Sequence, residues 1–394
     1  MTNEGMTIMP KATEPPAGTW KTAGDLPTPA AWHGQHDGPV LLVDGTVLVA
    51  GGADAAGGSL ADAALFGKKQ GADHDTWDRA DPMGTPRRLH SLTRLADGRV
   101  LVVGGLNGST EQGSAELYNP ATGHWTPTGG LITPRWGHSA TLLDDGSVLI
   151  AGGSASRPSG GTVALRSAER FDPGKEKWRS AGSMSDARTA HTAVPLHGGI
   201  VLVAGGTAPV GAPDDPALAF CELYDQARDR WTPTGSLISA RRHHRAVRLS
   251  DTSVLITGGT APGSPGTAPY DPFSRRTAEV FDLDTGKWTE VTAMPSGRAL
   301  HRAVLLPGGQ VMVAGGASGD RDESGFRSVL AYDVTGDAWA SVPGLVTGRW
   351  SFAAVVLADD RVLVAGGVAR SGLAAADPAA VELTATSEVF GETS

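Results

Sequence analysis

The chain has 394 residues, of which 33 are basic and 42 acidic, so its net charge is −9 at pH 7. Nucleic-acid binding requires clustered positive charge, and this acidic balance argues against such a partner. The composition includes 54 Gly, 26 Pro and a single cysteine, Cys221, which cannot form an internal disulfide. Abundant Gly and Pro between short apolar runs indicate many brief strands joined by tight turns.

Residues 1–18 are polar and proline-containing and lack the apolar core of a signal peptide. We expect them to form a flexible segment before a repeat region over residues 19–390 and a tail at residues 391–394. No apolar run reaches the length of a membrane helix. The sequence therefore predicts a cytoplasmic protein that makes no membrane contact.

Glycine pairs and tryptophans recur through the chain with a shared period of about 50 residues. The interval from each Trp to the next glycine pair is 27 residues in six repeats and 31 in the first. The pairs begin at Gly51, Gly104, Gly152, Gly205, Gly258, Gly315 and Gly366, and the tryptophans are Trp20, Trp77, Trp125, Trp178, Trp231, Trp288 and Trp339.

The third repeat shows the expected strands most clearly. An apolar run over residues 139–143 predicts the innermost strand, and Asp145-Gly146 predicts a hairpin turn into a second strand at residues 148–153. Residues 167–173 and 177–181 predict the third and fourth strands, with Trp178 on the outermost one.

The glycine pair, an aromatic residue in the third strand and a Trp in the fourth resemble the kelch-repeat family, in its bacterial type, over residues 19–390. The third-strand aromatic residues are Phe66, Tyr118, Phe171, Tyr224, Phe281, Tyr332 and Phe390. The resemblance implies an all-β fold, a seven-bladed kelch β-propeller with four antiparallel strands per blade.

The two ends of the repeat region predict how the ring closes. The last repeat stops at Phe390 with no Trp after it, and Trp20 has no glycine pair before it. Residues 19–24 are therefore expected to complete the last blade beside residues 386–390, which removes two exposed sheet edges. A closed ring needs no partner for its stability, so we expect a monomer.

An Arg-x-x-His motif precedes the innermost strand of five repeats, and the seventh repeat has Arg349 followed by Phe352. If these arginines face the channel mouth, they could bind carboxylate or phosphate. The alternative is that they pair with a glutamate repeated in the third strands, because buried charges must be paired. The arginines are Arg87, Arg135, Arg188, Arg241, Arg298 and Arg349, and the glutamates are Glu116, Glu169, Glu222, Glu279 and Glu388.

Departures from the repeat indicate where function could lie. The repeats differ in length mainly between the second and third strands, and connections of that kind on a rigid scaffold commonly carry recognition. Four extra residues in the first repeat fall within residues 31–37. The departures that we assign to a binding site at the mouth are Trp32, His33, His36, Asp37, Arg88, Trp136, Arg242, His243, Tyr270 and Trp350.

Two histidines and a carboxylate in residues 31–37 could hold a metal or move a proton, or could form a polar rim. Metal sites need three or four converging ligands, so we predict neither a metal nor a cofactor. Copper galactose oxidases resemble this family, but their chemistry requires a tyrosine crosslinked to a cysteine. Cys221 lies in the scaffold register of a third strand, so a copper radical oxidase is not expected.

The sequence thus favours a protein that binds a small anionic or polyhydroxylated molecule, or an acidic peptide or protein, at the mouth of the channel. An enzyme of the mutarotase, isomerase or lyase kind remains an alternative, with its acid and base drawn from the same mouth. A scaffold within a protein assembly is a second alternative.

Overall fold

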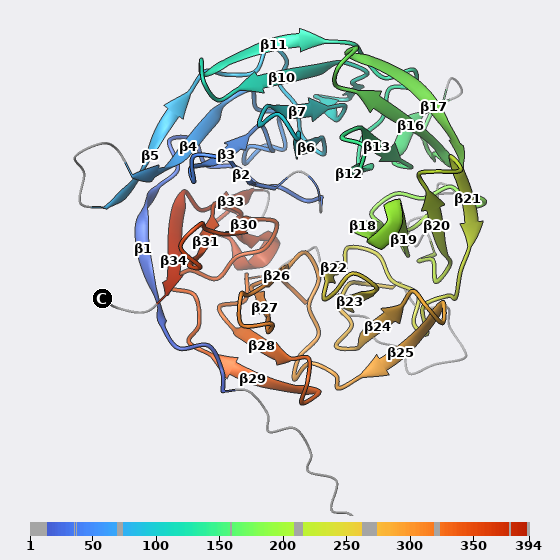
Figure 1. Ribbon diagram of the computed structural model, residues 1–394. Coiled ribbons are helices and arrows are strands. Elements are labelled where there is room, and N and C mark those ends of the chain that lie inside the picture. The colour runs from blue at the N-terminus through green and yellow to red at the C-terminus, as the bar shows by residue number, and fades with distance from the viewer. Residues whose placement is uncertain are drawn as a thin grey trace, which may run out of the picture.

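The computed structural model describes residues 14–34, 36, 38–68, 74–157, 160–208, 216–261, 274–318, 324–377 and 380–391. Within these residues, seven four-stranded antiparallel sheets stand around a central channel (Figure 1). The predicted all-β, seven-bladed propeller is confirmed. The described ranges contain no α-helix, only two single-turn 3-10 helices, η1 (His197–Gly199) and η2 (Gly372–Ala374).

Each blade runs outward from the channel, strand by strand. Blade 1 comprises β2 (Val40–Leu41), β3 (Val47–Ala50), β4 (Ala63–Lys68) and β5 (Asp75–Ala80). Blade 2 comprises β6 (Ser91–Arg94), β7 (Val100–Val103), β10 (Ala115–Asn119) and β11 (His124–Thr128). Blade 3 comprises β12 (Ser139–Leu142), β13 (Val148–Ala151), β16 (Ser167–Asp172) and β17 (Lys177–Ser183). Blade 4 comprises β18 (Thr192–Leu196), β19 (Ile200–Ala204), β20 (Cys221–Asp225) and β21 (Arg230–Pro233). Blade 5 comprises β22 (Arg245–Arg248), β23 (Ser253–Thr257), β24 (Ala278–Asp282) and β25 (Lys287–Val291). Blade 6 comprises β26 (Arg302–Leu305), β27 (Val311–Ala314), β28 (Val329–Asp333) and β29 (Ala338–Val342). Blade 7 comprises β30 (Ala353–Val356), β31 (Val362–Ala365), β34 (Thr386–Gly391) and β1 (Thr19–Asp25).

The ring closes in blade 7, where the N-terminal strand β1 pairs with the last strand, β34. Their register places Trp20 opposite Phe390 and Thr22 opposite Glu388. The two aromatic rings lie 5.3 Å apart between centroids. The predicted closure by the N-terminal strand is therefore what the structure shows, and in Figure 1 β1 runs along the outside of the ring beside β34.

The second strands end on glycine pairs because the backbone there touches the next blade. In the second blade, Gly104 and Gly105 have φ values of 64° and 95°, a region that L side chains rarely adopt. A Cβ atom on Gly104 would lie 2.6 Å from the carbonyl oxygen of Arg135 and 2.8 Å from the ring of His138. The pair is thus a contact surface between blades.

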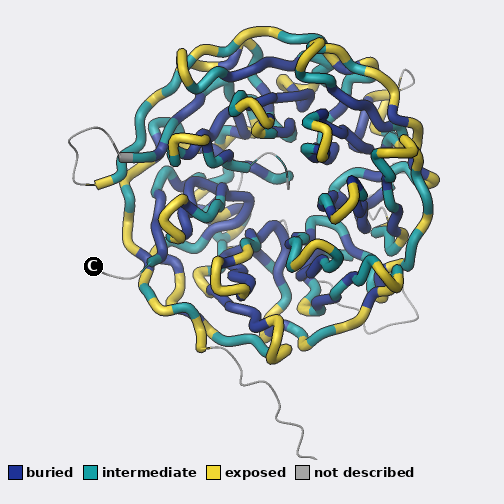
Figure 2. Tube along the Cα trace, viewed as in Figure 1, coloured by how far each residue is buried: buried dark blue, intermediate teal, exposed yellow. Residues whose placement is uncertain are grey.

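Apolar packing between neighbouring blades fills the ring, and Figure 2 shows the buried residues on the inner strands and the exposed ones at turns and along the outer strands. In each blade the third-strand aromatic ring packs at a tilt on the fourth-strand Trp, as Tyr118 does on Trp125 at 5.1 Å. The indole of Trp125 also donates a hydrogen bond to Asp81 of the preceding blade, at 2.9 Å. Through such a bond, the tryptophan of each of blades 1 to 6 joins two blades.

Three of the connections between second and third strands carry small hairpins on one face of the ring. These are β8 (Leu106–Asn107) with β9 (Thr110–Glu111), β14 (Ser154–Ser156) with β15 (Thr162–Ala164), and β32 (Val368–Ser371) with β33 (Val381–Leu383). We call this side of the molecule the loop face. No helix among the described ranges has the length and apolar character needed to cross a membrane.

We expect Trp20→Ala to lower the free energy of unfolding by about 3–5 kcal/mol, because it removes a large buried side chain from the closing strand. Lys21→Ala is the matched control, since Lys21 lies next to it in β1 and is exposed. Urea unfolding of both variants measures the difference. Equal stability of the two would show that β1 is not part of the cooperative ring.

Candidate functional site

The arginines of the repeated motif lie inside the blades. All six guanidinium groups are fully buried. Arg135, for example, donates to Glu169 at 2.7 Å, to the carbonyl oxygen of Gly152 at 2.9 Å and to that of Ser167 at 2.8 Å. A buried guanidinium with these bonds offers no surface to a ligand. The expectation that Arg135, Arg188, Arg241, Arg298 and Arg349 line the mouth is corrected, and the alternative of an ion pair with glutamate describes five of the six blades that have the arginine.

The glutamate of each pair also holds the segment that enters the blade. Glu169 accepts hydrogen bonds from the backbone N–H groups of Ile132 and Thr133, at 2.7 and 3.0 Å. Burial lowers the pKa of Arg135, and the charge and hydrogen bond of Glu169 act in the opposite direction. One carboxylate thus satisfies a cation and two backbone donors at once.

Blade 1 has lost the whole arrangement. Ala30 takes the place of the arginine, since its carbonyl oxygen still accepts the hydrogen bond from Gly367 of the preceding blade. Ala64 takes the place of the glutamate, opposite Val49. Pro27 stands where the first of the two backbone donors would be, and proline has no N–H to satisfy.

Blade 6 keeps the arginine but not the carboxylate. Leu330 replaces the glutamate, and Pro295 again removes the first backbone donor. Arg298 bonds instead to the backbone and side chain of Ser328, at 3.2 and 3.0 Å, and lies 5.7 Å from the ring of Phe326. Burial without an acidic neighbour lowers the pKa of Arg298 to about 10.

The repeated histidines form a belt around the channel. Each of the five rings packs against the first glycine of the preceding blade's pair, and in four of them Nε2 shares a hydrogen bond with a hydroxyl of that blade. The pairs are His138 with Ser91, His191 with Ser139, His244 with Thr192 and His301 with Thr257, at 2.8–3.0 Å. Burial first, and then nearby arginines, hold the pKa values of these four imidazoles well below the usual range.

Two aromatic residues replace histidine in this belt, and one of them is Trp32. Phe352 packs on Gly315 in blade 7, and Trp32 packs on Gly366 in blade 1. Trp32 is buried, and its indole points to the carbonyl oxygen of Ala50 at 3.4 Å. Its assignment to a ligand site is corrected: it fills the position that histidine fills in the other blades.

The four-residue insertion after Trp32 enters the channel and is held there by two arginines. Gly34 accepts hydrogen bonds from Arg245 at 3.0 Å and Arg302 at 2.8 Å, and Arg302 also donates to the carbonyl oxygen of Trp32 at 2.8 Å. The carbonyl oxygen of His36 accepts from the backbone of Leu92 at 2.8 Å. In Figure 1 this segment projects from β2 towards the centre of the ring. We call it the channel segment (residues 33–38, of which 35 and 37 are not described).

Arg245 and Arg302 were not among the predicted site residues, although the repeat contained the signal. They follow the belt histidine at the position that holds Ser91, Ser139 and Thr192 in blades 2 to 4. A cavity of about 270 Å³ lies beside the channel segment, and both arginines and His36 line it. His33 is half-buried in the same segment, while Asp37 and Tyr270 lie outside the described residues.

On the loop face, the residue after each motif arginine forms a β-bridge with the first residue of the connection between the second and third strands of its blade. Arg88 and Trp136 are half-buried there, and Arg88 donates to the carbonyl oxygen of Gly108 at 3.3 Å. Arg242 and His243 are also half-buried, at the mouth between blades 4 and 5. Trp350 is buried in an apolar cluster with Val368 of the β32/β33 hairpin, and this burial corrects its assignment as an exposed binding residue.

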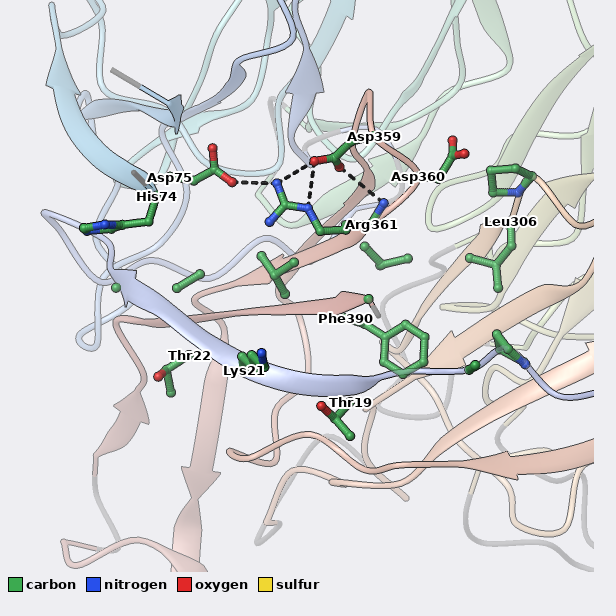
Figure 3. A pocket seen from close by; sticks show the side chains of 18 of the residues that line it. Thr19, Lys21, Thr22, His74, Asp75, Leu306, Asp359, Asp360, Arg361 and Phe390 are labelled. Carbon is green, nitrogen blue, oxygen red and sulfur yellow. Dashed lines mark hydrogen bonds and ion pairs between the residues drawn. The ribbon is translucent and has the colours of Figure 1, made fainter. Parts of the chain in front are cut away.

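A further hollow lies at the closing seam and is lined by none of the predicted residues. It measures about 1560 Å³ and is bordered by β1, the turn before Arg361 and the start of β5. Figure 3 shows Arg361 between Asp75 and Asp359, both at 2.7 Å. Arg361 thus bridges a carboxylate of blade 7 and one of blade 1, and the three groups together keep one negative charge.

Cys221 is buried at the start of β20, where its thiol donates weakly to Ala219 at 3.4 Å and packs near Leu237. Burial raises the pKa of this thiol to about 11. Among the described residues, no three or more His, Cys, Asp and Glu side chains are grouped so that they could hold a metal ion.

Comparisons with known proteins agree on the repeat. The Kelch motif model matches residues 87–131 and 135–185. Beta-scruin of Limulus polyphemus is 29% identical over 214 residues, which cover 52% of this chain and 22% of beta-scruin. Human Kelch-like protein 34 is 29% identical over 215 residues, covering 54% of this chain and 31% of that protein. The alignments thus span less than a third of either relative.

Solved structures show the same fold at low sequence identity. A fungal alcohol oxidase of the AA5 family, in complex with copper, has a TM-score of 0.71 at 18% identity, covering 95% of this chain and 76% of the oxidase. YjhT has a TM-score of 0.57 at 15% identity, covering 78% of this chain and 95% of YjhT. At these identities the likeness concerns the fold alone.

We expect Glu279→Leu, which gives blade 5 the residue of blade 6, to lower the free energy of unfolding by about 3–5 kcal/mol. The change leaves Arg241 buried without its carboxylate and removes the acceptor of two backbone N–H groups. Adding Arg241→Ala imitates blade 1 and should recover part of the loss. Urea unfolding of the single and double variants measures the coupling, and strictly additive losses would contradict it.

The histidine belt predicts that stability falls as the pH drops below about 6.5. The unfolded chain takes up protons at these imidazoles near that pH, whereas the folded chain resists protonation because the four pKa values are lowered. Each imidazole contributes up to about 1.4 kcal/mol per pH unit. His191→Phe, which copies Phe352, should reduce the slope of unfolding free energy against pH between 7.5 and 5.5. An unchanged slope would show that His191 does not titrate differently in the two states.

Proposed function

Since this chain belongs to the kelch-repeat β-propellers, we propose that it is a protein-interaction module that binds an acidic segment of a partner on its loop face. Its relatives include beta-scruin and Kelch-like proteins, but the alignments cover only a minor part of those proteins. The proposal therefore depends on the geometry of this chain.

The observation that carries the proposal is the contrast between a uniform ring and a varied loop face. The repeated arginine, histidine and glycine residues make buried structural contacts in nearly every blade, so they do not face a partner. The residues just beyond them vary and remain partly accessible, as Arg88, Trp136 and Arg242 show. Varied side chains on rigid supports are suited to recognition.

The charge of these positions favours an acidic partner. Within the described residues, neither Arg88 nor Arg242 takes part in an ion pair, in a chain whose net charge is −9. Because the channel segment lies in the channel between blades 1, 5 and 6, the mouth favours an extended partner lying across it over a deep funnel for a small molecule. Guanidinium groups at such a mouth attract carboxylates and orient them.

A second candidate function is the binding of a small carboxylate or phosphate inside the channel. The cavity of about 270 Å³ beside the channel segment favours it, because two guanidinium groups and an imidazole line this space. Its volume suits a ligand of about ten heavy atoms, since one water molecule takes about 30 Å³.

The partner test uses charge reversal on the loop face. Proteins captured from the source cell by the full chain should be lost when Arg88→Glu and Arg242→Glu are combined, because like charges then oppose the acidic segment. Arg248→Glu is the control, since this residue lies at the far end of β22, at the turn into β23. Quantitative mass spectrometry measures the capture. Equal capture by all variants would contradict the loop-face site, and a thermal shift with succinate or phosphate that survives the reversal would favour the channel cavity.

A further inference from the structure

Two large apolar side chains lie exposed on neighbouring segments of the loop face, between blades 4 and 5. Phe220 is 56% exposed and Ile238 is 57% exposed. Their backbones run side by side, since Leu237 donates to Ala219 at 2.9 Å and Thr234 donates to Cys221 at 3.1 Å. Exposed apolar groups that lie next to one another on an ordered backbone are typical of a contact surface.

The backbone at Ile238 is fixed by the buried ion pair of blade 5. The N–H groups of Ile238 and Ser239 donate to Glu279 at 2.7 and 3.1 Å, and Glu279 also binds Arg241. An apolar group held in this way loses little conformational freedom when a partner covers it.

From Ile238 the chain runs inward to a cationic end. Arg242 pairs with Thr260 on the loop face, and the N–H of His243 donates to Ala190 at 3.3 Å near the channel mouth. Beside this segment, Arg275 donates through Nε to the carbonyl oxygen of Ala240 at 2.9 Å. Within the described residues, neither Arg242 nor Arg275 forms an ion pair. The surface formed by Phe220, Ile238, Arg242 and Arg275, which we call the track, therefore has an apolar outer end and a positively charged inner end.

No other blade combines the two features. The positions that correspond to Ile238 and Arg242 hold an apolar residue followed by Trp in blades 3 and 7, and glycine followed by arginine in blade 2. Blades 1, 4 and 6 have proline or serine followed by a small residue at these positions. The combination is a property of one place in the ring and not of the repeat.

We infer that this track, formed by Phe220, Ile238, Arg242 and Arg275, docks an extended peptide segment of a partner protein. The segment carries a large apolar side chain for the outer end and a carboxylate three to five residues away for the inner end. Arg242 lies four positions after Ile238, a span of at most about 13 Å in an extended chain, which sets that spacing. The inference rests on the proposed function and names the chemistry of its partner.

Selection of a random dodecapeptide display library on the full chain tests the inference. Peptides enriched by the wild-type protein should combine an aromatic or aliphatic residue with Asp or Glu at the stated spacing. Fluorescence anisotropy should then show a loss of affinity of about tenfold or more for Phe220→Ser with Ile238→Ser, and a comparable loss for Arg242→Ser. Replacing the acidic residue of the peptide by its amide should weaken wild-type binding and leave binding to Arg242→Ser nearly unchanged.

Ile132→Ser is the matched control, because Ile132 occupies the same position in blade 3 and is 63% exposed. It should bind the selected peptides like the wild type, and thermal unfolding verifies that every variant is folded. Peptides that lose affinity with Arg88→Ser or Trp136→Ser, but not with Phe220→Ser and Ile238→Ser, would overturn the track while leaving loop-face binding in place. A selection that enriches no acidic peptide, or peptides indifferent to all these changes, would overturn both.

Discussion

The junction between blades depends on the repeated arginine, which bonds to the preceding blade through its carbonyl oxygen and to its own blade through its guanidinium group. The carbonyl oxygen of Arg135 accepts a hydrogen bond from Gly105 of the preceding blade at 2.9 Å, while its guanidinium bonds Glu169 inside its own blade. Because this charge is fully buried, moving the Arg135 backbone away from Glu169 would leave the guanidinium unpaired at a cost of several kcal/mol. The pair therefore fixes the register of one blade on the next, and the loop face is built on that register.

The departures from this arrangement gather near the closure. Blades 1 and 6, which lack the glutamate, flank blade 7, where the two ends of the chain meet. The channel segment leaves blade 1 and is bound by Arg245 of blade 5 and Arg302 of blade 6. Hydrogen bonds across the channel thus join the first blade to the later ones, in addition to the outer pairing of β1 with β34.

In this scaffold, a buried structural residue and an accessible loop-face residue can be direct neighbours in the chain. Arg241 is buried and paired, and Arg242, the next residue, is partly accessible on the loop face. Leu237 lies in the core, and Ile238 beside it is exposed. A side chain on the loop face can therefore vary without disturbing the junction, because the neighbouring residue supplies the structural bonds.

The sequence by itself determined the number of blades, the four strands of each and the closing strand, because every repeat must meet the same packing requirements. The sequence also allowed two interpretations of the repeated arginines, which were a place at the channel mouth or an ion pair with the repeated glutamate. Only the tertiary structure decided between them, since spacing along the chain does not say whether Arg135 points into a blade or into the channel. The direction of Trp32, the course of the channel segment and the adjacency of Phe220 and Ile238 likewise depend on contacts between residues distant in the chain, which a repeat pattern does not encode.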